Sequence, residues 1–486
     1  MVLNTWEPNV FKQISEFGSS LDVLLLSASV PVSQAGAGVD SVASVSASLS
    51  VLDSGTAGSG ANPVVDTGGV VGGFINTSAS LLPPMTGPYH FNNFKVGAAG
   101  FPAVGGSYVD PIFGGTVRRL TAQGAGLLDC DIYAHCWANA DGTMAFSHRE
   151  PSFHIISVVT GAILWPGQPE GNRPSGGEGA GETYWDPIDP GVYWFKSGAS
   201  FIRRTLATQT NQTVHTFPST LDPQNGSINI MNNDGRYVVL AWGGTAKIYD
   251  IQTNTIYANS ITPAGGGGWT GISPDGKYLI TGAPMRSYFI NHATQTLTTS
   301  GVTFWNLGGD HAAPISPSNG ENYCVCFENN DDGGVWMVDV TIPVVGPDVG
   351  PNPTQRAATR AQHTRLVNTT FAGAGGGHFS AVRKGARMDW CFWNSENWNA
   401  PPSNFNSTPS AGTWVPWGDE CIAINVITHE VRRFAHHRSR GVGETGEYSY
   451  QPRMSCSWDG SVAIFASNMN TANSGELYAL INPNLT

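Results

Sequence analysis

The sequence predicts an all-β chain: a seven-bladed β-propeller that follows an extended N-terminal segment. Three observations lead to this prediction. One type of turn recurs in a fixed position before apolar strands, the last sheet along the chain lacks its outer strand, and the composition suits many turns and few helices. The chain has 486 residues with 60 Gly, 31 Pro and only 12% charged residues, against roughly 25% charged residues in an average domain.

The recurring turn contains Asp-Gly, Asn-Gly or a close variant and lies just before a short apolar strand. Such pairs supply the positive φ that a tight hairpin needs, so each copy marks the turn between the first and second strands of an antiparallel sheet. A lone four-stranded sheet cannot bury both faces, whereas a ring of such sheets can. The five copies are Asn139–Gly142, Asn232–Gly235, Ser273–Gly276, Ser316–Gly320 and Ser457–Gly460.

From residue 114 onward the strand pattern divides into seven sheets, or blades. Each blade has two strands joined by the recurring turn, a third strand, a second turn and an outer strand. Radial repetition of such blades leaves only short edges. The predicted blades are 128–166, 181–218, 226–262, 267–304, 310–371, 376–440 and 448–482.

The two ends of this region complement each other. The last blade, 448–482, has three strands, and the chain offers no fourth after it. At the front, Gly115–Leu120 is a near copy of the outer strand Val431–Phe434, with no inner strands before it. We therefore expect Val117–Leu120 to pair with Leu477–Ile481 and close the ring, because closure removes both sheet edges.

The N-terminal region, residues 1–105, has a different composition. Between Leu21 and Gly73 it consists largely of Ser, Ala, Val and Gly, and Ser27–Val32 recurs as Ser46–Val51. Small and β-branched residues can form strands but offer too little bulk for a core, so this arm is expected to be ordered only against a partner. A flexible Gly/Ser linker is the alternative. The predicted domains are the arm, 1–105, and the propeller, 106–486.

The blades resemble those of the TolB and oligogalacturonate-lyase-like propellers. The resemblance rests on the five turns, above all Ser457-Trp458-Asp459-Gly460 followed by Ile464–Asn468. These motifs indicate the fold and not the function. Separately, the repeats of the arm resemble segments of structural proteins of tailed bacteriophages, which implies a role in assembly.

Histidines fall where the innermost strands of the blades begin. These starts are expected near Tyr133, Glu182, Ser227, Trp269, His311, His378 and Gln451. The lyases that the blades resemble hold a divalent metal with several His and a Gln at such positions, which polarises a uronate carboxylate. The resemblance implies His311, His378 and Gln451 as metal ligands, with His135 as a fourth. Manganese, calcium or zinc would be the cofactor.

This chain also departs from that pattern. In place of a His-Pro-His-like run on the last blade it has Tyr450-Gln451-Pro452-Arg453, so Arg453 brings a cation to the site. The catalytic candidates are His311, His378 and Arg453. The alternative interpretation is that these histidines form hydrogen bonds with the backbone or with water in the channel.

A second candidate site is a Trp-rich insertion in the sixth blade. Trp398, Trp414 and Trp417, with Asp419, are predicted to bind a glycan, because sugar rings stack on indole through their C–H faces. Packing between blades is the alternative for such tryptophans, and it is favoured for Trp390 and Trp393. The basic run His436–Arg440 is predicted to be a surface loop.

Charge and targeting signals limit the partners. The net charge of −12 disfavours nucleic acid and anionic membranes, which both attract cationic surfaces. No apolar run is long enough to span a membrane, and no signal peptide is evident at the start. A virion or extracellular location is therefore expected.

Two functions are compatible with these features. The favoured one is a virion structural or appendage protein of a bacteriophage, in which residues 1–105 dock on other virion subunits, the propeller is displayed for decoration or glycan binding, and the chain forms homo-oligomers within the assembly. The alternative is a metal-assisted polysaccharide lyase or hydrolase that acts at one mouth of the channel. A non-enzymatic role is favoured over the enzyme.

Overall fold

A computed structural model describes the propeller region of the chain. The described residues are 75–76, 96–110, 113–122, 137–149, 152–172, 183–222, 229–263, 269–282, 284–308, 311–328, 334–367, 377–395, 419–439, 451–469 and 475–485. Contacts divide the chain into Met1–Ala61 and Asn62–Thr486. The first unit lies wholly outside the described residues, so the predicted order of the arm and the boundary near residue 105 stay predictions.

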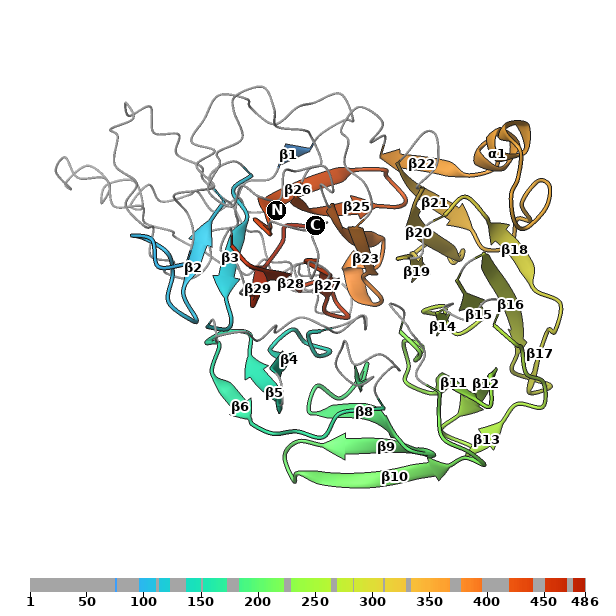
Figure 1. Cartoon of the computed structure of the whole chain (residues 1–486), viewed down its shortest axis with the longest axis horizontal. Helices are drawn as coiled ribbons and strands as arrows, with labels where there is room; N and C mark the ends of the chain where they lie inside the picture. The colour runs from blue at the N-terminus through green and yellow to red at the C-terminus, as the bar shows by residue number, and fades with distance from the viewer. Residues whose placement is uncertain are drawn as a thin grey trace, which may run out of the picture. The chain divides into compact units, whose positions relative to one another are not determined.

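Seven antiparallel sheets stand around one axis, as the sequence predicts (Figure 1). Blade one contains β4 (Met144–Arg149), β5 (Ser152–Ser157) and β6 (Ile163–Trp165). Blade two contains β7 (Thr183–Trp185), β8 (Val192–Ser197), β9 (Ser200–Thr205) and β10 (Thr210–Thr216). Blade three contains β11 (Tyr237–Trp242), β12 (Thr245–Asp250) and β13 (Thr255–Ile256). Single bridges at Ala138 and Met231 supply the innermost segments of blades one and three.

The remaining blades are built in the same way. Blade four contains β14 (Thr270–Ile272), β15 (Tyr278–Thr281), β16 (Met285–Asn291), β17 (Thr296–Leu297) and β18 (Val302–Trp305); blade five β19 (Ala313–Ile315), β20 (Tyr323–Phe327), β21 (Val335–Asp339) and β22 (Thr364–Val367); blade six β23 (Gly377–Ala381), β24 (Trp390–Ser395), β25 (Glu420–Asn425), β26 (Val431–His436) and β1 (Ile75–Asn76); blade seven β27 (Ser455–Cys456), β28 (Val462–Ser467), β29 (Glu476–Ile481), β3 (Thr116–Arg119) and β2 (Ser107–Val109).

The predicted closure of the ring is confirmed. Strand β3 from the front of the propeller pairs antiparallel with β29 at its end, with Val117 opposite Leu480 and Arg119 opposite Tyr478. The amide of Leu120 continues the ladder by donating to the Leu477 carbonyl at 2.9 Å. Two strands go beyond the prediction, because β1 and β2 each add a fifth, outermost strand to blades six and seven.

The similarity in sequence between the two outer strands has a structural reason. Arg119 on β3 holds the carboxylate of Glu476 with two hydrogen bonds of 2.8 and 2.7 Å. Arg433 on β26 likewise donates two hydrogen bonds to the carboxylate of Glu420. Each Glu begins the third strand of its blade and is fully buried. The repeated arginine therefore neutralises a buried carboxylate in two neighbouring blades.

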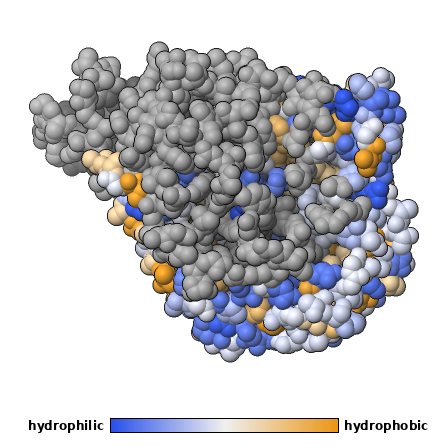
Figure 2. Space-filling model, in the orientation of Figure 1, coloured by the Kyte–Doolittle hydropathy of each residue, from blue (hydrophilic) through white to orange (hydrophobic). Residues whose placement is uncertain are grey.

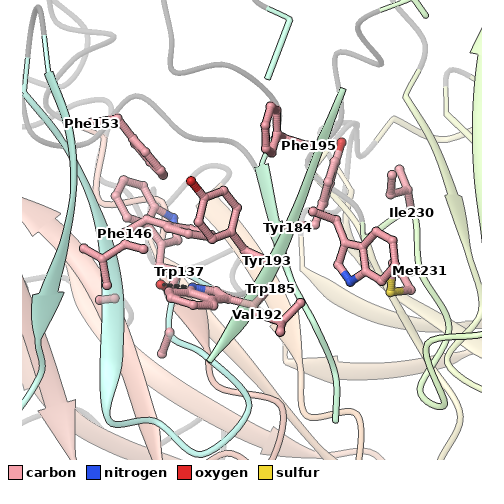
Figure 3. Packing of buried hydrophobic residues seen from close by; sticks show 14 of the residues in the cluster. Trp137, Phe146, Phe153, Tyr184, Trp185, Val192, Tyr193, Phe195, Ile230 and Met231 are labelled. Atoms are coloured by element: carbon pink, nitrogen blue, oxygen red, sulfur yellow. Dashed lines mark hydrogen bonds between the residues drawn. The ribbon is translucent and has the colours of Figure 1, made fainter. Parts of the chain in front are cut away.

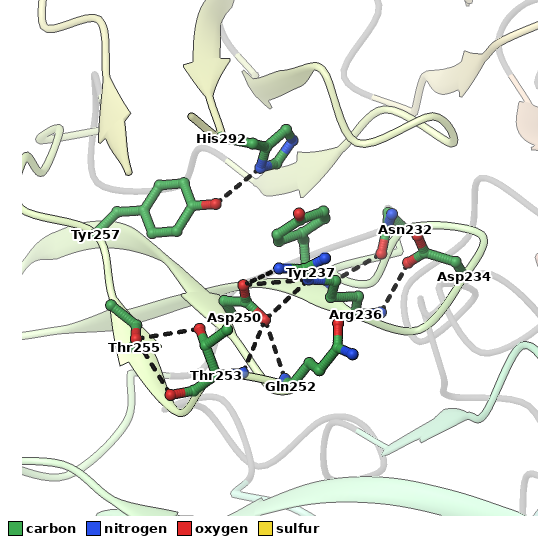
Figure 4. A network of polar contacts seen from close by, with 10 residues as sticks. All are labelled: Asn232, Asp234, Arg236, Tyr237, Asp250, Gln252, Thr253, Thr255, Tyr257 and His292. Carbon is green, nitrogen blue, oxygen red and sulfur yellow. Dashed lines mark hydrogen bonds and ion pairs between the residues drawn. The ribbon is translucent and has the colours of Figure 1, made fainter. Parts of the chain in front are cut away.

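Side chains at the recurring turns cap the second strand in blades one, three and four. The Oδ1 atom of Asn232 accepts a hydrogen bond from the Tyr237 amide at 2.9 Å (Figure 4). Asn139 Oδ1 likewise accepts a hydrogen bond from the Met144 amide, and Ser273 Oγ accepts one from the Tyr278 amide. The turn glycines have positive φ, for example 73° at Gly235. The turn signal in the sequence thus reflects both backbone geometry and a satisfied buried amide.

Replacing Asn232 by Ala tests this cap. The Asn232 side chain is 3% exposed, so its loss leaves the Tyr237 amide without its acceptor. We expect the free energy of unfolding to fall by about 1–2 kcal/mol, measured by chemical denaturation. Asn232→Ser, which restores an acceptor of the kind found at residue 273, should recover part of the loss; equal stability of all three proteins would contradict the role.

The largest core cluster of the described residues joins blades one, two and three with strands β28 and β29 of blade seven (Figure 3). The rings of Phe146 and Trp185 stack at a centroid distance of 4.3 Å with 8° between their planes. Trp185 Nε1 donates to the carbonyl of Trp137 at 2.9 Å, which satisfies the buried indole across the boundary between blades. Large aromatic side chains thus fill the wedge between neighbouring sheets.

Polar networks hold the outer parts of neighbouring blades together. In blade three the Arg236 guanidinium pairs with Asp250, and in blade four His292 reaches back to the same region (Figure 4). The Nε2 atom of His292 donates to the Gly276 carbonyl at 2.9 Å, and its Nδ1 atom lies 2.8 Å from the Tyr257 hydroxyl in a second hydrogen bond. His292 therefore joins blade four to blade three.

The structure contradicts one further prediction, contains a helix that was not predicted, and confirms the packing role of two tryptophans. The sequence predicts a surface loop for the basic run His436–Arg440, which is wrong, because its described residues, His436–Ser439, are buried. Helix α1 (Pro353–Arg360) is not predicted from the sequence, although Asn352 and Gln355 form its capping box. Trp390 and Trp393 are buried within blade six, which confirms packing as their role.

The surface shown in Figure 2 is mostly polar over the described outer strands. Among the described residues, large exposed apolar side chains are few and separated along the chain; they include Ile163, Ile188 and Phe289. Within the described ranges no helix is both long and apolar enough to cross a membrane.

Candidate functional site

The candidate residues come from three adjacent blades. His311 lies just before β19 of blade five, His378 is the second residue of β23 in blade six, and Gln451 and Arg453 precede β27 of blade seven. These are the innermost strands, which run in the same direction and line the axis. Their first residues therefore gather at one end of the axis, called here the histidine mouth.

Two of the predicted residues meet directly. The imidazole rings of His311 and His378 lie 4.1 Å apart between centroids, with 50° between their planes. His378 is 5% exposed, whereas His311 is partly exposed. The sequence alone could not establish this contact, because the two residues lie in different blades and only the adjacency of blades five and six brings them together.

Gln451 is also enclosed, as is Arg453, which is 2% exposed. The Gln451 side chain is 2% exposed, and its Oε1 atom is buried with no hydrogen-bond partner among the described residues. A buried amide oxygen without a partner costs about 1–3 kcal/mol. This atom is therefore an acceptor that a cation or a hydrogen-bond donor would satisfy.

Backbone contacts fix the segment that carries Gln451 and Arg453. The carbonyl of Pro452 accepts from the Ala466 amide at 2.8 Å. The amide of Met454 donates to Asn394 Oδ1 at 2.8 Å, and Asn394 lies opposite His378 in the β23–β24 register. Blade seven is thus tied to the part of blade six that carries His378.

The donors in this group suit a divalent metal. Imidazole nitrogens and amide oxygens both bind first-row metals, and the buried Gln451 Oε1 supplies an oxygen. His311, His378 and Gln451 would hold the ion; His135, the fourth predicted ligand, lies outside the described residues. Over the described ranges no group of three or more His, Cys, Asp and Glu side chains has the geometry of a metal site.

The predicted glycan site falls mostly outside the described part of the chain. Trp398, Trp414 and Trp417 belong to residues 396–418, which are not described. Asp419 is buried, and its carbonyl accepts from the His437 amide at 3.0 Å. The glycan role of these four residues stays a prediction. The ends of the insertion are described, because it leaves β24 one residue after Asn394 and returns at β25.

A buried polar cluster between blades six and seven has no counterpart in the sequence predictions. Asp110, in the loop between β2 and β3, accepts hydrogen bonds from the amides of His436 and Phe113, both at 3.0 Å. Arg438 Nη2 lies 3.7 Å from the Asp110 carboxylate. Burial raises the pKa of Asp110, but contacts with His436 and Arg438 outweigh burial, and its pKa lies well below the usual range. No sequence signal links residues so far apart.

The fold defines the chain as a seven-bladed β-propeller. No protein-family model matches the sequence, and no curated protein matches it. Among solved structures, it is similar to an oligogalacturonate lyase from Vibrio parahaemolyticus, which is 10% identical with a TM-score of 0.48; 78% of this chain and 96% of that chain are covered.

Two further solved structures give similar values. An oligogalacturonate lyase in complex with manganese is 13% identical with a TM-score of 0.46, with 78% of this chain and 96% of that chain covered. The structure of U3-55K is 10% identical with a TM-score of 0.43, and 75% of this chain and 98% of that chain are covered.

Proposed function

We propose that this protein is a metal-assisted polysaccharide lyase that acts on an acidic glycan at the histidine mouth. The contact between His311 and His378 supports this proposal most strongly, because their imidazole rings, 4.1 Å apart between centroids, lie close enough for both to bind one metal ion. The buried Gln451 Oε1 adds an oxygen donor. The donor set, and not the fold, is the basis of this proposal.

Different residues of the chain would hold the ion and the substrate. His311, His378 and Gln451 would hold the ion, and the guanidinium of Arg453 would pair with a uronate carboxylate. A bound divalent cation would polarise that carboxylate and acidify the proton on the adjacent carbon. In the elimination that follows, this proton passes to a base, the glycosidic oxygen leaves with its bonding electrons, and a carbon–carbon double bond forms.

The Trp-rich insertion suits the same role. Both of its ends are anchored beside Asn394, which pairs with His378. Trp398, Trp414 and Trp417 would supply indole faces for neighbouring sugar rings. The virion role favoured by the arm remains a prediction from the sequence, since the repeats on which it rests lie outside the described residues.

Elemental analysis together with a cleavage assay tests the proposal. We expect about one divalent ion per purified chain, and an increase in ultraviolet absorbance from unsaturated uronate when the protein is incubated with polygalacturonate or another polyuronate. His311→Ala should lose the ion and slow cleavage by about a hundredfold or more.

His292→Ala is the matched control, because that histidine bonds Tyr257 in blade three and Gly276 in blade four, away from the blades that carry the histidine mouth. It should keep both the ion and the activity. A metal-free wild-type protein that cleaves no polyuronate, even after manganese, calcium or zinc is added, would refute the proposal.

A further inference from the structure

A short segment after β23 reaches across the axis. Arg383 belongs to blade six, yet its Nε atom donates to Asn233 Oδ1 at 3.1 Å in blade three. Its Nη2 atom contacts the carbonyls of Met231 at 3.0 Å and Ile272 at 3.4 Å, in blades three and four. One side chain of blade six therefore contacts two blades, neither of which adjoins blade six in the ring.

The next residue extends these contacts to further blades. Lys384 Nζ donates to the carbonyl of Pro187 at 2.6 Å in blade two. The backbone amides of Arg383 and Lys384 both donate to the Trp458 carbonyl at 3.0 Å in blade seven. The Arg383 guanidinium also lies 5.1 Å from the centre of the Trp458 ring.

These contacts place the two side chains on the axis. In a ring of seven blades, blades two and three stand across the centre from blade six, so a side chain can join them only through the centre. Met231 and Ile272 end the innermost segments of their blades. Arg383 follows the end of β23, whereas His378 lies at its beginning. The crossing is therefore at the end of the axis opposite the histidine mouth.

The geometry points to Arg383 and Lys384 as a plug that closes this far end of the axial channel. Arg383 is 2% exposed, and carbonyl and amide oxygens on the opposite blades accept its hydrogen bonds. Such charge-assisted bonds are about twice as strong as neutral ones. A ligand that reaches the axis is then expected to enter from the histidine mouth and not from the plugged end. The plug does not depend on whether the histidine mouth binds metal.

The reactivity of two buried cysteines measures whether the plug opens. Cys456 in blade seven has its Sγ 3.5 Å from the Ser380 carbonyl, close to the crossing segment. Cys326 in blade five is equally buried but lies on β20, away from the axis. Opening of the far mouth should expose Cys456 alone, whereas global unfolding exposes both thiols.

The test is alkylation of the folded full-length chain with N-ethylmaleimide, followed by mass spectrometry of the two cysteine peptides. Arg383→Met keeps an unbranched apolar side chain and removes the hydrogen-bond donors of the guanidinium. We expect it to raise the labelling rate of Cys456 relative to Cys326 by about tenfold or more. Arg204→Met is the matched control, because Arg204 is also buried but its hydrogen bonds within the described ranges go to Gln168, Gln209 and Asn211, all beside blade two. It should leave the ratio unchanged.

An unchanged ratio in Arg383→Met would overturn the inference, and so would a parallel rise at both cysteines. If Arg383→Met does not fold, Arg383→Lys is used instead, because lysine keeps the positive charge but lacks the planar guanidinium with its several N–H donors. A rise in the Cys456 to Cys326 ratio in that variant supports the plug, and a wild-type ratio refutes it.

Discussion

Removal of residues 1–122 is expected to prevent the propeller from folding, whereas removal of residues 1–95 leaves the ring closed. Both truncations lose β1, so they differ only in the closing hairpin β2–β3. Val117 and Leu120 are fully buried in the complete ring, and each contributes roughly 1.5–3 kcal/mol by burial. Without Arg119 the buried Glu476 is left uncompensated, which costs about 3–5 kcal/mol.

Together these losses are comparable with the whole free energy of unfolding of a typical domain, about 5–15 kcal/mol. The open edge of β29 would also promote aggregation. Thermal unfolding followed by circular dichroism, with size-exclusion chromatography, distinguishes the two truncated chains. A peptide of residues 96–122 added in trans should restore folding to the shorter chain. Equal melting temperatures for the two truncations would show that the β3–β29 pairing does not close the ring.

Asp110→Ala is the second substitution with a large expected effect. It removes the acceptor of the His436 and Phe113 amides and leaves Arg438 without this carboxylate. Because the site is fully buried, we expect a loss of about 3–5 kcal/mol in the free energy of unfolding. Chemical denaturation at neutral pH measures it. A loss below about 1 kcal/mol would contradict the assignment of Asp110 as the residue that fixes the closing hairpin to blade six.

The pH dependence of stability gives an independent check on Asp110. The pKa of its carboxyl is lowered in the folded state, so its stabilising contribution is fully present above the unfolded-state pKa of about 3.9 and is lost as the pH falls toward the folded-state pKa. Wild type should therefore lose more stability between about pH 6 and pH 3 than Asp110→Asn, which has no charge to lose. Parallel pH profiles for the two proteins would contradict this result.

The fold was predictable because its signals are local. Each Asn-Gly or Asp-Gly turn fixes a hairpin within a few residues, and Asn232 and Gly235 satisfy both requirements of that hairpin, a capped amide and a positive φ. Closure could also be predicted, since Val117–Leu120 copies Val431–Phe434 and one strand was missing at the end. The same arginine in both copies neutralises a buried Glu in each blade.

The site was predictable only in part. The sequence determined which residues begin the innermost strands, and so it proposed His311, His378 and Gln451 together. Only the tertiary structure decided that the two imidazoles meet, that Asp110 and His436 are buried against each other, and that Arg383 crosses the axis to blades three and four. Turns and strand periodicity depend on neighbours in sequence, whereas these contacts depend on how seven separately encoded sheets pack around one centre.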